Sequence, residues 1–251
     1  MDEFIQKAEF MAGMKRAWRF AQQHRAIGVG ALGYHSYLQS KLVEFESMEA
    51  KMINHSIFNS LKERTEAASK WLHDAKGYKC IREGYANTTL MAIAPTKSSS
   101  FIHGAVSMGI EPIKSNYFIK DLAKSKTIYK NPFLIEELEK YGLNTKETWD
   151  SILKKDGSVQ HLDFPTKAVF KSFIEISPKE IVIQAAARQK YIDQSQSLNL
   201  MIDPSVPAKD INQLYLFAHE QELKHYIISS VRVQHKHLHV TFWSVQAVKA
   251  N

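Results

Sequence analysis

The 251-residue sequence contains a single cysteine, Cys80, and this scarcity excludes several kinds of chemistry. One thiol cannot form a disulfide within the chain, complete a cysteine zinc cluster or provide a two-thiol redox centre. No apolar run approaches the roughly 20 residues that a membrane-spanning helix needs. Because the first residues are acidic rather than basic, we expect neither a transmembrane anchor nor a secretory signal, and we expect a cytoplasmic chain with no membrane partner.

Acidic residues are missing from the last 28 positions, residues 224–251. The same stretch holds four lysines and arginines and four of the 11 histidines. A net charge of +7 suggests a nucleic-acid binder, whose affinity would fall steeply with salt. Because more than half of the excess positive charge lies in this tail, we predict no nucleic-acid partner.

Hydrophobic residues make up 44% of the chain and charged residues 24%, which suits a folded domain. Apolar spacing predicts helices over residues 13–24, 47–77, 132–141, 146–155, 177–196 and 208–222, and one starting at 101. Short apolar runs predict strands over 26–30, 88–94 and 197–202. Helices that alternate with short buried strands indicate an α/β fold with parallel strands. No repeat or linker indicates a second domain.

A glycine pattern, Gly28-x-Gly30-x-x-Gly33, matches the dinucleotide-binding fingerprint. The strand before it is very short, and a long helix occupies the region where a second strand should end in an acidic residue. We therefore favour tight packing between a strand and a helix as the reason for these glycines.

Two further candidates have simpler explanations. His235, His237 and His239 would share one face of a strand and could bind a transition metal, but no carboxylate or cysteine accompanies them. We favour an incidental cluster and predict no metal site. Cys80 has no base-and-orienter arrangement near it in sequence, so we predict no catalytic residue in this chain.

The strongest local chemistry lies between the strand over 88–94 and the following helix. The loop consists of Pro95, Thr96, Lys97, Ser98, Ser99 and Ser100. Hydroxyls and backbone amides at the start of a helix, with a lysine beside them, are typical of a phosphate site. Serine-rich loops also occur as plain helix caps, so composition alone leaves both interpretations open.

Five stretches together resemble the C-terminal part of the large, catalytic chain of class I ribonucleotide reductase. They are residues 25–33 (RAIGVGALG), 87–100 (NTTLMAIAPTKSSS), 109–112 (GIEP), 115–118 (SNYF) and 188–199 (RQKYIDQSQSLN). The resemblance implies that residues 1–224 form the C-terminal half of a ten-stranded α/β barrel with parallel strands and surrounding helices, incomplete on its own. It further implies that the loop over 95–100 binds the phosphates of a ribonucleoside diphosphate, whose 2′ carbon is reduced by radical chemistry.

The same resemblance shows what this chain does not supply. The family uses a cysteine pair as reductant and a third cysteine as radical, and its Asn-x-Cys-x-Glu segment lies before the matched region. We therefore expect a fragment, or one piece of a split ribonucleoside-diphosphate reductase, that is inactive alone. Its expected partners are an N-terminal half, a small subunit that holds the di-metal tyrosyl radical centre, and thioredoxin or glutaredoxin as reductant. We expect no cofactor bound by this chain. The alternative is a non-catalytic phosphate-binding or assembly module.

Residues 225–251 depart from the family. Where the family has Leu-Tyr-Tyr and later a terminal dithiol, this chain continues His225-Tyr226-Ile227-Ile228. The codons ACA TTA TAT TAT C, for Thr-Leu-Tyr-Tyr, read one base later as CAT TAT ATT ATC, for His-Tyr-Ile-Ile. We interpret this divergent tail as the product of a shifted reading frame.

Overall fold

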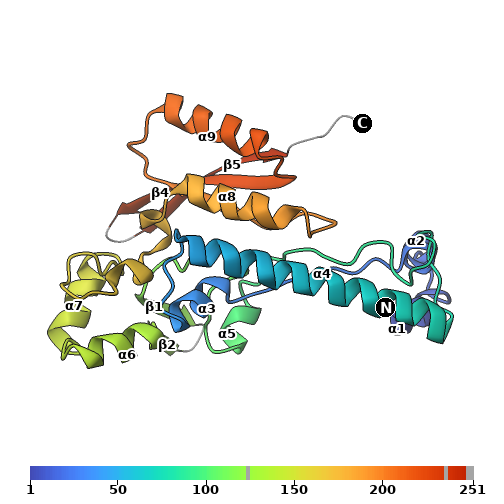
Figure 1. The fold of residues 1–251 in the computed structure, drawn as a ribbon, viewed down its shortest axis with the longest axis horizontal. Helices are drawn as coiled ribbons and strands as arrows, with labels where there is room; N and C mark the ends of the chain where they lie inside the picture. Colours follow the sequence, from blue (N-terminus) through green and yellow to red (C-terminus); the bar gives the residue numbers. More distant parts are fainter. Residues whose placement is uncertain (123–124, 235–236, 247–251) are drawn as a thin grey trace.

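The computed structural model describes residues 1–122, 125–234 and 237–246 (Figure 1). The helices are α1 (Asp2–Ala8), α2 (Lys15–His24), α3 (Tyr34–Ser40), α4 (Met48–Lys76), α5 (Ser99–Ile102), α6 (Pro132–Lys140), α7 (Lys146–Lys154), α8 (Pro178–Gln189) and α9 (Ala208–Glu220), with 3-10 turns at Lys167–Phe170 and Phe173–Glu175. The strands are β1 (Tyr117–Leu122), β2 (Ser125–Lys130), β3 (Asn199–Ile202), β4 (His225–Gln234) and β5 (His237–Gln246). In the part of the chain that the structure describes, no helix is long and apolar enough to cross a membrane.

Helix α4 is the longest element, with 29 residues, and its two ends follow from the sequence. The side chain of Ser47 accepts a hydrogen bond from the Ala50 amide at 3.1 Å, which caps the first turn. Gly77 ends the helix in the left-handed conformation, with a φ of +69° that costs a glycine little. The predicted helix over residues 47–77 is therefore confirmed.

The predicted helix from residue 101 is wrong in extent, because α5 is a single turn that ends at Ile102. Gly104 and Ala105 both adopt left-handed conformations, with φ of +84° and +57°, which a right-handed helix cannot contain. Helix α8 also stops short of the predicted end at 196, because the chain turns after Gln189.

Parallel backbone contacts link segments that are far apart in the sequence. The Val29 amide donates to Leu90 O at 2.7 Å, and the Ala92 amide donates to Val29 O at 3.1 Å. The Ile93 amide donates in turn to Ser195 O at 3.2 Å. Together with the parallel pairing of β3 with β4, these contacts bear out the predicted parallel arrangement for four chain segments.

Two predicted strands are much less regular than expected. The segments over 26–30 and 88–94 contribute only isolated bridges, Val29 to Met91 and Ile93 to Gln196. The amides of Leu90 and Met91 donate to the carboxylate of Asp193 instead of to a neighbouring strand, at 2.7 and 2.9 Å. This side chain interrupts the backbone ladder at the place where a strand was expected.

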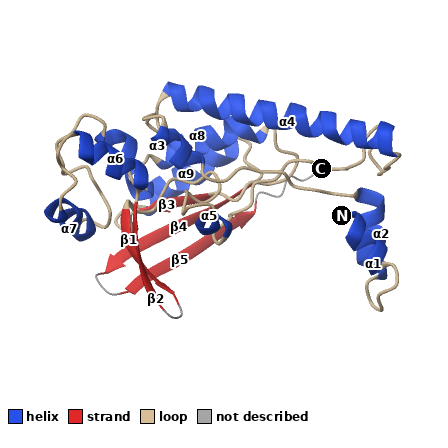
Figure 2. Ribbon diagram, turned by 90° about the horizontal axis from the view of Figure 1, so that it is seen from below, coloured by secondary structure: helices blue, strands red, loops and turns tan. Residues whose placement is uncertain are grey.

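Two antiparallel strand pairs are also present in the described structure, and they were not predicted. Strands β1 and β2 pair with each other, and β5 pairs with β4 to give the order β3-β4-β5. Figure 2 shows α4, α8 and α9 gathered to one side of this sheet. The divergent tail therefore extends the sheet, and its boundary at residue 224 stays a prediction.

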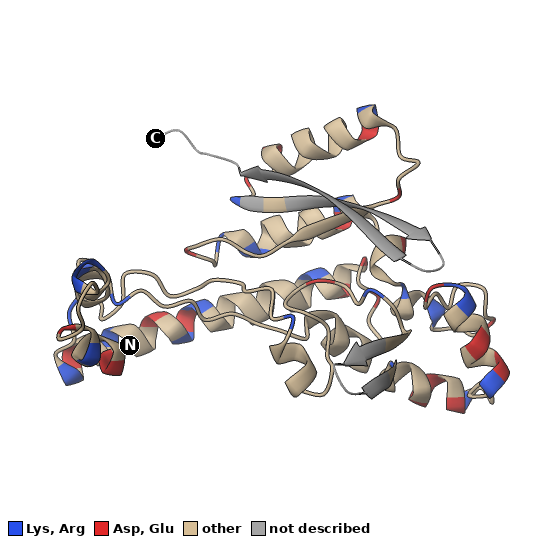
Figure 3. Ribbon diagram, turned by 180° about the vertical axis from the view of Figure 1, so that it is seen from behind, with Lys and Arg blue, Asp and Glu red and all other residues tan. Residues whose placement is uncertain are grey.

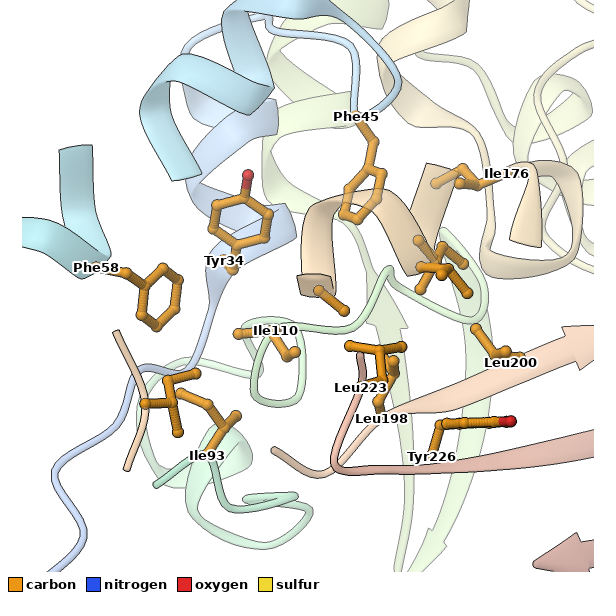
Figure 4. Packing of buried hydrophobic residues seen from close by; sticks show 14 of the residues in the cluster. Tyr34, Phe45, Phe58, Ile93, Ile110, Ile176, Leu198, Leu200, Leu223 and Tyr226 are labelled. Carbon is orange, nitrogen blue, oxygen red and sulfur yellow. The ribbon is translucent and has the colours of Figure 1, made fainter. Parts of the chain in front are cut away.

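The main hydrophobic core lies between these helices and the sheet. Figure 4 shows part of it, in which Tyr34, Phe45 and Phe58 lie with Ile93 and Ile110. Further members come from β3, α8 and α9, and Tyr226 of β4 is 2% exposed within it. A second core joins α6 and α7 to the turn that follows them, with the buried residues Leu134, Leu138, Trp149, Ile152, Val159, Phe164, Val169 and Phe170.

Three buried amide side chains connect the two cores. The Asn131 Nδ2 group donates to Gln39 Oε1 at 3.0 Å and to Asn116 Oδ1 at 2.8 Å. Asn116 in turn donates to the carbonyls of Gly157 and Phe170 at 3.0 and 2.8 Å. Each amide is at most 1% exposed, so these bonds satisfy groups that would otherwise be costly to bury.

Helices α1 and α2 form a small hairpin at the far end of α4 (Figure 1). Asp2 and Arg25 join its two ends with an ion pair of 2.6 Å. Phe10 is 86% exposed and Phe20 57% exposed. An open apolar depression of about 480 Å³ is lined by Met1, Phe4, Ala17, Phe20, Ala21 and Ala26. This hairpin therefore exposes several apolar side chains to solvent.

Candidate phosphate site

The loop over residues 95–100 follows directly from the irregular strand that ends near Ile93. That strand is held on both sides, by Val29 on one edge and by Ser195 on the other. Ser197 also donates from its amide to Ile93 O at 2.8 Å. The loop therefore begins at the end of a fixed backbone segment, as binding loops do in open α/β sheets.

Internal bonds fix the shape of the loop. Thr96 adopts a left-handed conformation with φ of +46°, and its hydroxyl accepts a hydrogen bond from the Gly109 amide at 2.8 Å. Ser100 is 1% exposed and donates from its hydroxyl to Lys97 O at 3.3 Å. The hydroxyls of Thr96 and Ser100 are thus engaged within the protein.

The remaining groups of the loop face outward. Lys97, Ser98 and Ser99 are exposed. Among the described residues, nothing accepts a hydrogen bond from the amides of these three residues. Three amides, two hydroxyls and one ammonium group are consequently available to an anion. Helix α5 has only four residues, so its dipole adds little and the individual donors matter more.

A buried carboxylate lies beside the loop. Glu111 is 8% exposed, and its Oε1 accepts from the Asn199 amide at 2.9 Å and from Asn199 Nδ2 at 2.6 Å. Burial raises the pKa of Glu111, and the Asn199 hydrogen bonds and the charges of Lys114 and Lys97 offset only part of this rise. Glu111 was not among the predicted site residues.

Asp193 is a second residue near the loop that was not predicted. Its carboxylate ties down the amides of Leu90 and Met91, and its own carbonyl accepts from Lys224 Nζ at 2.6 Å. Glu111 and Asp193 both lie within stretches that carry the family resemblance, residues 109–112 and 188–199. That resemblance was the available signal, because apolar spacing does not reveal which polar groups meet.

The glycine pattern serves packing. A Cβ atom on Gly30 would lie 2.3 Å from Ala92 O, and one on Gly28 would lie 2.8 Å from Ala92 Cβ. Gly33 has φ of +78° immediately before α3. The close contact joins two strand-like segments rather than a strand and a helix, which corrects the partner that we expected. These contacts account for the glycines without a nucleotide.

The other candidate residues are not assembled into a site by the described part of the structure. His235 lies outside the described residues, and the side chains of His237 and His239 are not described. Within the described ranges, no group of three or more His, Cys, Asp or Glu residues lies together as a metal site. Cys80 is half-buried, and its Sγ contacts the carbonyls of Arg82 and Tyr85 at 3.4 and 3.3 Å.

A protein-family comparison matches nearly the whole chain. The model described as "Ribonucleotide reductase, barrel domain" aligns with residues 10–81 and 69–228. The chain belongs to the ribonucleotide reductase barrel family. The expected family is therefore confirmed, and the number of ten strands stays a prediction.

Relatives of this reductase barrel include large subunits from viruses. The ribonucleoside-diphosphate reductase large subunits of Invertebrate iridescent viruses 6 and 3 are each 38% identical to it, over 88% and 84% of this chain. The solved class Id ribonucleotide reductase alpha subunit of Actinobacillus ureae is 51% identical, with a TM-score of 0.81 over 90% of this chain. This chain spans 24% and 35% of the two viral proteins and 42% of the solved chain.

Proposed function

We propose that this chain supplies the substrate-phosphate loop and part of the barrel of a ribonucleoside-diphosphate reductase. The observation that carries the proposal is the loop over residues 95–100, whose outward amides, hydroxyls and lysine are matched to a diphosphate. Fixed donors of this kind bind phosphate oxygens without reorganising, which favours a defined orientation of the nucleotide. Thr96 and Ser100 would shape the loop, and Lys97, Ser98 and Ser99 would contact the phosphates.

The reduction itself requires groups that this chain does not have. Replacing the 2′-hydroxyl by hydrogen consumes two electrons and two protons and releases water, and a dithiol that becomes a disulfide can provide them. Cys80 is the only cysteine in the sequence and cannot form that disulfide alone. We therefore propose that an N-terminal half of the large chain brings the reactive cysteines.

Open edges and exposed apolar groups support a companion chain. Strand β5 ends the sheet, so in the described structure one of its edges has no neighbouring strand. Unpaired strand edges and apolar patches promote association. Phe10 and Phe20 of the N-terminal hairpin are exposed apolar side chains of the kind that such patches contain. We also propose a radical-generating small subunit, which would hold the di-metal tyrosyl centre, and thioredoxin or glutaredoxin as reductant.

Reconstitution tests this function. The full chain would be mixed with a separately produced N-terminal half, the small subunit and a dithiol, and deoxyribonucleoside diphosphate would be measured. We expect product only in the complete mixture. Cys80→Ser should leave turnover unchanged, and Lys97→Ala should raise KM for the diphosphate more than it changes kcat. Product formed by this chain and dithiol alone would refute the proposal that an N-terminal half brings the reactive cysteines.

A non-catalytic module is the second candidate, and the tail favours it. His225-Tyr226-Ile227-Ile228 stands where the resembling family has its tyrosine pair. This alternative expects the nucleoside diphosphate to bind to the full chain while the complete mixture yields no deoxynucleotide. Reconstituted turnover would exclude it.

A further inference from the structure

The loop over residues 95–100 packs directly against the segment that contains Glu111. Thr96 accepts a hydrogen bond from the Gly109 amide at 2.8 Å. A Cβ atom on Gly109 would lie 3.0 Å from Ala94 O and 3.9 Å from Pro95 O, so the two backbones approach closely. A change in charge on one segment therefore changes the electrostatic potential at the other segment.

Within the described residues, the carboxylate of Glu111 is buried and accepts hydrogen bonds from a single residue. In the described structure, both hydrogen bonds to its carboxylate come from Asn199 and end on the same oxygen, Oε1. The carboxylate is 8% exposed, and the charged groups that act on it are Lys97 and Lys114. Lys97 thus acts electrostatically on the buried Glu111 carboxylate and also lies on the side of the loop that is open to an anion.

We propose that Glu111 is a positioning residue that couples anion binding at the loop over 95–100 to the uptake of one proton. The inference rests on the proposed function of that loop. When an anion engages Lys97, it neutralises the charge that favours the Glu111 carboxylate and adds a negative charge nearby. Both effects favour the protonated carboxyl. By reciprocity, protonating Glu111 tightens the binding of the anion.

The protonation of Glu111 sets the direction in which anion affinity changes with pH. Because burial raises the pKa of Glu111 above its usual value, its carboxylate takes up a proton at a higher pH than an exposed glutamate does, and lowering the pH from 7 to 5.5 shifts it toward the protonated form. The affinity for a fixed-charge anion should then rise by up to about fivefold, which is the effect of one unit charge roughly 10 Å away in a medium between protein and water.

The test uses sulfate, whose charge is constant over this pH range, and the full chain. Dissociation constants would be taken from the chemical shifts of the amides of residues 97–99 at pH 7 and pH 5.5. We expect tighter binding at pH 5.5 in the wild type. Glu111→Gln should bind about fivefold more tightly than the wild type at pH 7 and should lose most of the pH dependence. Glu83→Gln, which removes an exposed carboxylate and changes the net charge equally, should behave like the wild type.

A second pair of measurements separates coupling from a purely structural role. Asn199→Ala removes the side-chain donor and should raise the pKa of Glu111, which moves the pH midpoint of sulfate binding upward. In the wild type, the carboxyl ¹³C shift of Glu111 should titrate at a higher pH with sulfate than without it. This wild-type measurement decides the matter even when Glu111→Gln does not fold.

The outcomes distinguish the two proposals. Equal sulfate affinity for wild type and Glu111→Gln at both pH values, with an unchanged Glu111 titration, overturns the coupling and leaves the phosphate loop intact. Amides of residues 97–99 that do not respond to sulfate at any pH overturn both the loop assignment and the coupling. A pH effect of about fivefold that persists in Glu111→Gln assigns the dependence to another group and refutes the role of Glu111.

Discussion

Replacing Asp193 by alanine should destabilise the strand that leads into the phosphate loop. The Asp193 carboxylate accepts from the amides of Leu90 and Met91 at 2.7 and 2.9 Å, and both of these residues are 1% exposed. A buried amide left without an acceptor costs about 1–3 kcal/mol, so the loss of both acceptor contacts in Asp193→Ala should lower the free energy of unfolding by about 2–6 kcal/mol. Asp193→Asn keeps an acceptor oxygen and should cost about 1 kcal/mol.

Urea unfolding of the full chain, followed by circular dichroism, measures this difference. Asp150→Ala is the control, because Asp150 is exposed on α7 and its replacement should change the free energy of unfolding by less than about 0.5 kcal/mol. Sulfate binding to the loop should weaken in Asp193→Ala, since the backbone before Pro95 loses its anchor. Equal unfolding free energies for Asp193→Ala and Asp150→Ala would refute the reasoning.

Three further predictions concern other parts of the chain. Burial lowers the pKa of His35 to about 3, so the neutral ring is favoured in the fold, and stability is lost as the pH falls below 6.5, by about 1.4 kcal/mol per pH unit. His35→Asn, which keeps an acceptor for the Ile113 amide, should flatten this dependence when urea unfolding is compared at pH 7 and 5.5. An unchanged dependence on pH would show that another group is responsible. Gly30→Ala should lower the free energy of unfolding by about 1–3 kcal/mol, because its Cβ would lie 2.3 Å from Ala92 O, and a wild-type urea midpoint would contradict the close contact. The coding DNA, read one base earlier from the codon of Lys224, should contain two adjacent tyrosine codons, and their absence would exclude the shifted frame.

The sequence predicted local structure well where capping and periodicity agree. Ser47 and Gly77 mark the ends of α4 within one residue, and helices α6, α7 and α9 follow their apolar spacing. The predicted strands near Val29 and Met91 were too regular, because Asp193 takes the hydrogen bonds that a ladder would use. A contact across more than 100 residues leaves no trace in local spacing.

The phosphate loop over residues 95–100 stays a prediction, and the structure places further polar residues beside it that the sequence did not indicate. Composition and the family resemblance together predicted a phosphate loop at residues 95–100, and the structure shows that the hydroxyls of Thr96 and Ser100 form hydrogen bonds within the protein. Glu111 and Asn199 were missed as site residues because their meeting depends on the packing of β3 against the segment after α5. Only the tertiary structure brings those two groups together.

The amide link formed by Gln39, Asn116 and Asn131 limits how the α6–α7 lobe can move. A displacement of about 1 Å would lengthen these hydrogen bonds beyond the range in which they form, whereas apolar contacts would only weaken over the same distance. Sliding the lobe by that distance would therefore leave buried amides without partners, at a cost of about 1–3 kcal/mol for each. A graft of this lobe onto a related barrel would therefore have to carry all three amides, since any two of them would leave a polar group stranded in the seam.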